Sequence, residues 1–308
     1  MAELTKSQSI GYGLLNAGLR CISALPLDVL YAFSDIAYPF VRTFYRKKVV
    51  RKNLEEAFPR RSKEELRKIE SDFYHHFCDL LAEIVKQPSM SREMMMEHMK
   101  FIGIDRMRKV YADGDDLLIC YLGHFGNWEW VASLQYWVPE IHCTQVYHPL
   151  YDKVFDKTFL NIRTRYGGEC IPMKSAVRRL IQLRNEKTKT VCGMISDQLP
   201  KWNAIHHFTH FLNHETAVFT GSEQLGKKLG ASFMYGRVAK PKRGHYVLEW
   251  LPVDIRDDES GEGFEVTDAY MRMLEKDIEA HPELWLWTHK RWRRTKEEWE
   301  ERNKEKKE

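Results

Sequence analysis

Residues 117–129 have the sequence Leu-Leu-Ile-Cys-Tyr-Leu-Gly-His-Phe-Gly-Asn-Trp-Glu, and they decide the fold. The first six are apolar without interruption, which is typical of a strand buried on both faces of a parallel sheet. Gly123 and Gly126 then supply the backbone freedom of a tight turn, and residues up to 138 carry a helical pattern. A buried strand, a glycine turn and a helix in this order predict a βαβ unit with a ligand site at the turn.

Further helices and strands are predicted on both sides of this stretch. Residues 53–58 and 62–87 predict helices, the second with an apolar stripe at three- and four-residue spacing. Further strands are expected at 142–147, 169–173, 190–195, 231–240 and 245–255, and further helices at 155–167, 174–185, 220–230 and 265–280. Strands that alternate with helices predict an α/β fold with a mostly parallel central sheet flanked by helices.

Composition limits the class of protein. The chain has 308 residues, of which 43% are hydrophobic and 30% charged, as in a globular protein with a sizeable core. Lys plus Arg is 48 and Asp plus Glu is 44, so the net charge of +4 is too small for a dedicated nucleic-acid binder. The six cysteines are scattered without a pairing rhythm, which indicates a reducing compartment and no disulfide framework.

Residues 10–45 are unusually apolar, but Arg20, Pro26 and two aspartates interrupt them. Two helices separated near Pro26 fit this pattern, and the basic run 46–48 follows them. Apolar helices with a basic flank favour a segment that lies in an anionic membrane surface. A buried helical hairpin and a full membrane span are the alternatives. We therefore expect a membrane-associating segment at 1–50, a catalytic domain at 51–295 and a charged tail at 296–308.

The chemistry is expected at His124 and Glu129. They are five residues apart, so they meet only if His124 lies in the turn and Glu129 in the first helical turn. A neutral imidazole can then take a proton from an alcohol while the carboxylate orients it. The chain has no GxSxG elbow and no obvious nucleophile beside this histidine, which favours direct attack by an acceptor hydroxyl without an acyl-enzyme. Alternatively, His124 is a structural turn residue and Glu129 complements a helix dipole.

Other clusters admit two interpretations. Four histidines at 206, 207, 210 and 214 form either a metal site or, as we expect, a polar loop, so no metal or cofactor is predicted. One group of basic residues forms either a docking patch for an acidic protein or an ordinary solvated face. The aromatic and basic ending suits lipid headgroups better than a nucleic-acid platform. The basic group is Lys174, Arg178, Arg179, Lys227 and Lys228, and the ending is Trp285, Trp287, Lys290, Arg291, Trp292, Arg293 and Arg294.

The HFGNWE stretch after a strand resembles the HX4E/D box of the glycerolipid acyltransferase superfamily. Over about residues 15–295, the chain resembles the late lipid A acyltransferase family, the lauroyl and myristoyl transferases of lipid A biosynthesis. The resemblance rests on the order and spacing of several segments. They are LPLDVLY, RKKVVRKNLEEAFP, FYHHFCDLLAE, GHFGNWEW, QVYHPLYDKVFDKTFLNIRTRYGGECIP, the ISDQ turn, GSEQLGKKLGASFMYGR and PELWLWTHKRWRR.

The resemblance implies transfer of a fatty acyl chain from an acyl carrier protein thioester to a hydroxyl of a lipid A precursor. It implies His124 as the base, Glu129 as its partner, and Arg163 or Arg165 as a phosphate ligand. Asp197 would lie at the pocket, and Asn127 and Gln198 complete the expected substrate-binding residues. Many members have Tyr-Arg-Pro where this chain has Tyr147-His148-Pro149. The resemblance further implies a peripheral or monotopic enzyme at the cytoplasmic face of an inner membrane.

Two rival functions remain open at this stage. The first is an acyltransferase of the same mechanism whose acceptor is a lysophospholipid or an aminolipid. The second is a non-catalytic protein that binds membranes or anions, in which His124 and Glu129 are replaceable. The sequence leaves the acyl chain length and the acceptor open, because one methylene in a pocket is worth only about 1–3 kcal/mol and leaves no motif.

Overall fold

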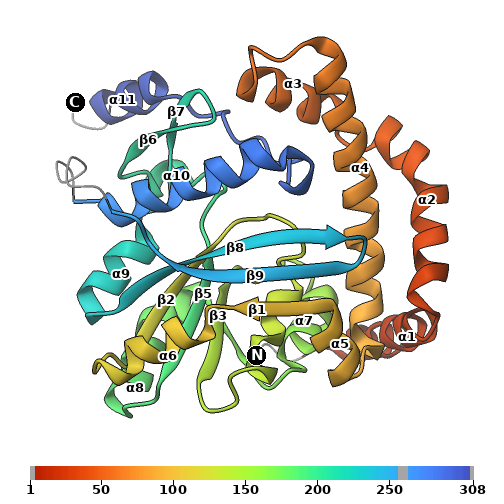
Figure 1. Ribbon diagram of the computed structural model, residues 1–308, viewed down its shortest axis with the longest axis horizontal. Helices are drawn as coiled ribbons and strands as arrows, with labels where there is room; N and C mark the ends of the chain where they lie inside the picture. The colour runs from red at the N-terminus through yellow and green to blue at the C-terminus, as the bar shows by residue number, and fades with distance from the viewer. Residues whose placement is uncertain (1–3, 256–262, 306–308) are drawn as a thin grey trace.

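The computed structural model describes residues 4–255 and 263–305 (Figure 1). Within them, seven strands form one sheet in the order β1-β9-β8-β2-β5-β3-β4. Neighbouring strands run parallel, except that β8 and β9 pair in antiparallel fashion. The predicted α/β class with a mostly parallel sheet is therefore confirmed. The last three residues of the predicted charged tail lie outside the described residues.

The long apolar runs became strands with nearly the predicted bounds. The run at 117–122 is β2, all six of whose residues are buried. Short strands with polar residues were not predicted, namely β1 and the separate antiparallel pair β6–β7. The strands are β1 Met99–Ile102, β2 Leu117–Leu122, β3 His142–Tyr147, β4 Glu169–Pro172, β5 Thr190–Ile195, β6 Phe208–Phe211, β7 His214–Ala217, β8 Ser232–Lys242 and β9 His245–Pro252.

Helices cover the sheet and one of its ends. In Figure 1, α10 lies above the sheet, and α4 stands upright across the end of the sheet. The helices that follow the N-terminal pair are α3 Lys47–Ala57, α4 Lys63–Lys86, α5 Arg92–His98, α6 Ile104–Ala112, α7 Lys153–Thr164, α8 Ala176–Asn185, α9 Gly221–Leu229, α10 Glu265–Ala280 and α11 Lys296–Glu305. Short 3-10 turns include η1 Gln87–Ser89, η2 Trp130–Tyr136, η3 Met173–Ser175, η4 Trp202–Ala204 and η6 Pro282–Leu284.

One expected helix differs in type. The residues after Glu129 form the 3-10 helix η2 instead of an α-helix. The side-chain oxygen of Asn127 accepts a hydrogen bond from the backbone N–H of Trp130, and the Ser133 hydroxyl bonds back to the carbonyl of Trp130. Such local side-chain bonds compete with the α-helical pattern. The Trp130 side chain is also completely buried, so tertiary packing decides the geometry here.

The apolar N-terminal stretch forms two helices, as predicted, α1 (Lys6–Ser23) and α2 (Leu27–Phe44). Their axes meet at 105°, and no described helix alone is long and apolar enough to cross a bilayer, although this bent pair passes the same test jointly. The inner face of α2, which includes Leu30 and Tyr31, is buried, and α2 packs along the outer side of α4 (Figure 1). The outer face is an exposed apolar stripe: Val29, Phe33, Ile36, Phe40 and Phe44.

Candidate active site

The turn after β2 presents His124 at the carboxyl end of the strand. Gly126 has φ +60, and a Cβ added there would lie 2.6 Å from a methyl carbon of Val238. A side chain at this position would therefore meet both backbone strain and a steric clash. A Cβ at Gly123 would lie 2.7 Å from a methyl carbon of Leu274 in α10. Both glycines of the predicted turn are thus needed for the chain to pass between its neighbours.

The ring of His124 is held by Asp197, which follows the neighbouring strand β5. His124 Nδ1 lies 2.6 Å from Asp197 Oδ1, and the backbone N–H of His124 donates to Asp197 Oδ2 at 2.8 Å. The register of the sheet explains the contact, because Leu122 is paired with Ile195. His124 and Asp197 each lie two residues beyond this pair, at the same edge of a parallel sheet.

The C-terminal segment fixes this turn from the other side. The N–H of Leu286 donates to the carbonyl of His124, and the N–H of Gly126 donates to the carbonyl of Leu284. Trp285 donates its indole N–H to Asp197 Oδ2 at 2.8 Å. The expectation that Trp285 and its neighbours lie at lipid headgroups is therefore wrong for part of the segment, since the side chains of Trp285, Trp287 and Arg291 are buried.

Electrostatics set the protonation pattern of the pair. Burial disfavours the charged form of Asp197, but the adjacent His124 ring and the three hydrogen bonds outweigh it, so the pKa of Asp197 lies below its ordinary value. An ionised Asp197 accepts a hydrogen bond from Nδ1–H of the ring, so the ring keeps its proton on Nδ1 and has its lone pair on Nε2. The carboxamide Nε2 of Gln198 lies 3.4 Å from His124 Nε2. The arrangement matches the base and orienting carboxylate of acyl-transfer sites.

Glu129 has a different partner from the one predicted. Its two carboxylate oxygens accept hydrogen bonds from Nε and Nη2 of Arg163 in α7, at 2.8 and 2.6 Å. Burial disfavours the Arg163 charge, yet the contacts to Glu129 raise the pKa of Arg163 above its ordinary value. The carboxylate on the His124 ring is Asp197, so the expected orienting role of Glu129 is corrected. Glu129 is the residue directly before η2, and its carboxylate there lies against Arg163 of α7 instead of the His124 ring.

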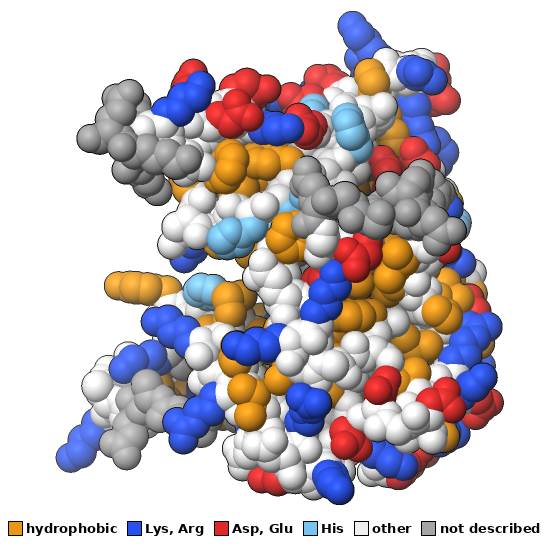
Figure 2. Space-filling model, turned by 90° about the vertical axis from the view of Figure 1, so that its left-hand side faces the viewer, with side chains coloured by type: hydrophobic (Ala, Val, Ile, Leu, Met, Phe, Trp, Pro, Cys, Tyr) orange, Lys and Arg blue, Asp and Glu red, His pale blue; other side chains and the backbone are white. Residues whose placement is uncertain are grey.

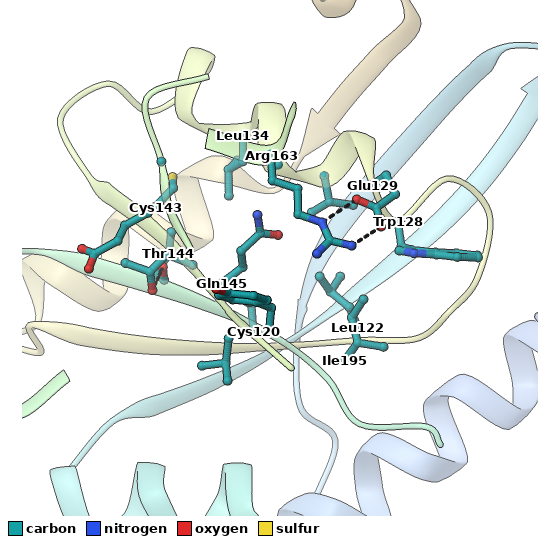
Figure 3. Close-up of a pocket in the computed structure, with 18 of the residues that line it drawn as sticks. Cys120, Leu122, Trp128, Glu129, Leu134, Cys143, Thr144, Gln145, Arg163 and Ile195 are labelled. Carbon is teal, nitrogen blue, oxygen red and sulfur yellow. Dashed lines mark hydrogen bonds and ion pairs between the residues drawn. The ribbon is translucent and has the colours of Figure 1, made fainter. Parts of the chain in front are cut away.

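A cavity of about 400 Å³ joins these two polar pairs. His124, Gln198, Glu129 and Arg163 line it together with His148. Figure 3 shows the Glu129–Arg163 pair on one side and Gln145 pointing toward the middle of the cavity. The deeper wall is largely apolar and comes from β2, β3, β5 and η2, through Cys120, Leu122, Val131, Leu134, Cys143, Val191 and Ile195. A mostly apolar cavity with a few convergent polar groups suits a ligand with a hydrocarbon portion.

Two of the predicted substrate-binding residues are engaged elsewhere. Asn127 is completely buried, and its amide donates to Glu83 Oε2 at 2.7 Å while its oxygen caps η2. Arg165 donates to the backbone carbonyls of Gln87 and Met90. Neither residue is among those lining the cavity. The structure therefore gives both side chains supporting contacts, whereas Arg163 and Gln198 line the cavity.

The carboxylate that holds Asn127 was not predicted. Glu83 in α4 is completely buried and also accepts hydrogen bonds from the hydroxyls of Tyr31 in α2 and Tyr246 in β9, both at 2.8 Å. Burial raises the pKa of Glu83 to about 7. In the sequence, Glu83 is one acidic residue in an amphipathic helix, and its neighbours give no signal of burial. The network joins the N-terminal helix, the sheet and the active-site turn.

The remaining polar clusters separate into paired and unpaired residues. Arg179 pairs with Glu169, and Lys227 pairs with Glu223 and Glu265, so two residues of the predicted docking patch are occupied. Of the loop histidines, His207 contacts Asp268 and His214 stacks on Trp292. Across residues 4–255 and 263–305, no group of three or more His, Cys, Asp or Glu side chains is arranged to hold a metal ion.

Comparison with known proteins gives the family. The family description "Bacterial lipid A biosynthesis acyltransferase" matches residues 2–294, which is nearly the whole chain. A comparison with curated protein sequences finds no match. The matched span includes the His124 turn, the Asp197 loop and the C-terminal segment that joins them. The chain therefore belongs to the bacterial lipid A biosynthesis acyltransferase family and is an acyltransferase.

Proposed function

We propose that His124 is the general base for transfer of a fatty acyl chain from a thioester of acyl carrier protein to a hydroxyl of a lipid A precursor. The observation that carries the proposal is the His124–Asp197 pair at an apolar cavity. Nε2 of His124 takes the hydroxyl proton as the oxygen attacks the thioester carbonyl carbon. The C–S bond then breaks, and the departing thiolate takes the proton back from Nε2. The products are an ester and a free thiol.

Direct transfer without an acyl-enzyme is supported by the cysteines of the cavity. Cys120 and Cys143 line it, but burial raises the pKa of the Cys143 thiol to about 12 and that of Cys120 well above its ordinary value. A thiol that holds its proton this strongly is a poor nucleophile. The hydroxyl of the acceptor is therefore the attacking group. Gln198, beside His124 Nε2, is positioned to donate its amide N–H to an oxygen of the reacting centre.

The apolar part of the cavity is proposed to hold the acyl chain, and the Glu129–Arg163 pair forms its polar wall. Because Glu129 uses both oxygens on Arg163, the pair is close to neutral as a unit. It therefore suits the orientation of a polar portion of a substrate better than the capture of an isolated phosphate. Glu129→Gln would loosen Arg163 and should lower activity without changing the tautomer of His124.

Carrier-protein docking is proposed on the strip formed by η3 and α8. Met173, Val177 and Ile181 recur at four-residue spacing and are exposed, and Met173 also lines the cavity. Lys174 and Arg178 lie between them, and neither has a carboxylate partner among the described residues. Figure 2 turns the end of the molecule that carries α8 to the viewer, and Lys and Arg side chains gather around apolar ones on its lower part. An acidic carrier protein complements such a surface.

Membrane attachment is proposed through the apolar stripe of α2 and the exposed face of α1, on the cytoplasmic face of the inner membrane. The stripe includes Phe33, Phe40 and Phe44, whose side chains are 58%, 63% and 80% exposed. A contiguous apolar face of this length is a poor fit to water and a good fit to the interfacial layer of a bilayer. It would hold the enzyme beside a lipid acceptor.

The test is a rate measurement on two histidines of the same cavity. His124→Ala should lower kcat by about 10²–10⁴, because a general base typically contributes that factor. His148→Ala is the matched control, since His148 also lines the cavity but, among the residues that the structure describes, its ring bonds to the backbone carbonyl of Pro149 and to no carboxylate. A folded His124→Ala protein with near-normal turnover would remove the proposed mechanism. Acyl carrier protein and coenzyme A thioesters, and phosphorylated glycolipid and lysophospholipid acceptors, should be compared in the same assay.

A further inference from the structure

A second hollow lies between α3 and the C-terminal segment, apart from the cavity of the active site. It measures about 380 Å³ and is lined by four cationic side chains and one carboxylate. The cationic residues are Lys48 and Lys52 of α3 and Lys290 and Arg293 of the C-terminal segment; the carboxylate is Glu56. The mechanism proposed above uses none of them. We refer to this hollow as the basic cleft.

Most of the positive charge in the basic cleft is not neutralised by the protein. Lys52 Nζ lies 3.7 Å from Glu56 Oε1, which is long for an ion pair. Lys48, Lys290 and Arg293 have no carboxylate partner among residues 4–255 and 263–305. Like charges held around one concavity repel one another, so an anion entering it gains attraction from several cations at once. The cleft is also far larger than one water or one small ion requires.

The two walls of the cleft are fixed to each other, so the cations are not on independent loops. Asn53 of α3 is buried and donates its amide to the carbonyls of Trp287 and His289, at 2.8 and 2.7 Å. Arg46, which precedes α3, donates to the carbonyl of Thr288 at 3.0 Å. A rigid cleft holds its charges in place before a ligand arrives, which lowers the entropy cost of binding.

The cleft adjoins both the apolar stripe and the catalytic pair. The stripe ends at Phe44, the last residue of α2, and Lys48 is the second residue of α3, which follows after a break of two residues. On the other wall, His289 precedes Lys290, and His289 Nε2 accepts a hydrogen bond from the N–H of Leu199, two residues from Asp197. A ligand of the cleft would therefore place a negatively charged group in the cleft and its apolar chains toward the stripe. It would also lie close to the active site.

We propose that the basic cleft binds the phosphate group of a lipid headgroup. Lysine ammonium groups act as point charges for phosphate, and Arg293 can bind two phosphate oxygens at once. Basic pockets beside an apolar membrane-facing surface bind anionic lipid headgroups. The headgroup comes either from the acceptor or from the surrounding bilayer. The proposal rests on the proposed membrane-bound acyl transfer for the class of lipid, and the binding arm of its test does not require turnover.

The experiment uses the full chain with Lys290→Gln and Arg293→Gln combined. The matched control is Lys100→Gln with Lys109→Gln, two exposed lysines on β1 and α6, which lie at the opposite end of the molecule from α3 (Figure 1). Binding is measured by sedimentation with phosphatidylcholine vesicles, with and without phosphatidylglycerol. A basic residue at an anionic surface contributes about a fivefold factor, so the double variant should lose about thirtyfold in partitioning onto the anionic vesicles. The control variant should change less than about twofold.

A second arm distinguishes the source of the phosphate. In neutral detergent micelles, a cleft that binds the acceptor itself predicts a KM for the acceptor raised about thirtyfold with kcat kept, and the difference disappears with a dephosphorylated acceptor. A cleft that binds bilayer lipid predicts an unchanged KM in micelles and weaker binding to anionic vesicles only. The proposal is overturned if both arms match the control variant, or if binding to neutral vesicles falls equally. A His124→Ala protein that lacks turnover but binds anionic vesicles normally would separate this site from the catalytic one.

Discussion

Replacement of Asp197 by Asn tests the proposed role of the His124–Asp197 pair in catalysis. Asp197 Oδ1 faces the His124 ring, while Oδ2 accepts from both the His124 backbone N–H and the Trp285 indole. Asn has one oxygen and one NH2 group. If the oxygen takes the two N–H donors, the NH2 faces Nδ1 and forces the ring proton onto Nε2, where the base needs a lone pair. The reverse orientation leaves two buried donors unsatisfied, at about 1–3 kcal/mol each.

The first orientation is therefore favoured, and the variant should hold His124 in the inactive tautomer. We expect kcat to fall by about 10²–10⁴ at saturating substrate, because the general base then lacks its lone pair. The melting temperature should change little, because the substitution is isosteric. A kcat within about tenfold of wild type would refute the reasoning.

Trp285→Phe provides the matched comparison for Asp197→Asn. It removes one of the two donors to Oδ2. The Asn side chain then has a weaker preference for the orientation that places its NH2 group against His124 Nδ1. In the Trp285→Phe background, Asp197→Asn should therefore cost about tenfold less than it does alone, since one unsatisfied donor fewer is worth roughly 1–3 kcal/mol. The four rates form a double-mutant cycle, in which the loss of packing from Trp285→Phe cancels. Additive losses would contradict the tautomer argument.

Three further predictions concern other parts of the chain. Burial raises the pKa of Glu83 from 4.5 to about 7, so its carboxyl contributes stability below about pH 4.5 that is lost as pH rises through about 7. Glu83→Gln removes this pH dependence of the free energy of unfolding, which amounts to about 3 kcal/mol. In denaturant unfolding, the variant should therefore be destabilised relative to wild type by less at about pH 8 than at about pH 5. Phe40→Ser with Phe44→Ser should move the protein from the membrane to the soluble fraction, whereas high salt should release wild type only partly, because apolar contacts are not screened. Lys174→Glu with Arg178→Glu should raise KM for acyl carrier protein, less so at high salt, with little change for acyl coenzyme A; unaltered kinetics would move the docking surface elsewhere.

The sheet was predictable because the amino-acid composition of its central strands is distinctive. Strands buried on both faces need runs that are almost wholly apolar, and 117–122 and 190–195 have them, so their bounds were predicted correctly. β1 and the β6–β7 pair have four residues each and include polar ones, and such segments are defined by tertiary pairing rather than by their own pattern. The 3-10 form of η2 depends on a side-chain cap that the sequence does not distinguish from a helix start.

The partner of His124 illustrates a different limit. Spacing along the chain favours Glu129 as the partner, because its carboxylate is close to His124 in the sequence. In a parallel sheet, however, the ends of adjacent strands lie side by side, whatever their separation in sequence, and Asp197 is 73 residues away. The signal was present: His124 and Asp197 each follow a buried apolar run by the same two residues. It becomes usable only once β2 and β5 are known to be neighbours, which neither run specifies.

The N-terminal helix α2 has two faces with separate tasks, and this decides how its membrane role must be tested. Its outer face is the apolar stripe, while its inner face sends the Tyr31 hydroxyl to the buried Glu83, which also holds Asn127 in the active-site turn. Removal of residues 1–45 would leave Glu83 without one of its three donors and would expose the side of α4 that α2 covers. Lost activity in such a truncation would then report on the turn as much as on the membrane. Substitutions confined to the outer face, such as Phe40→Ser, leave the Glu83 network intact and so separate attachment from catalysis.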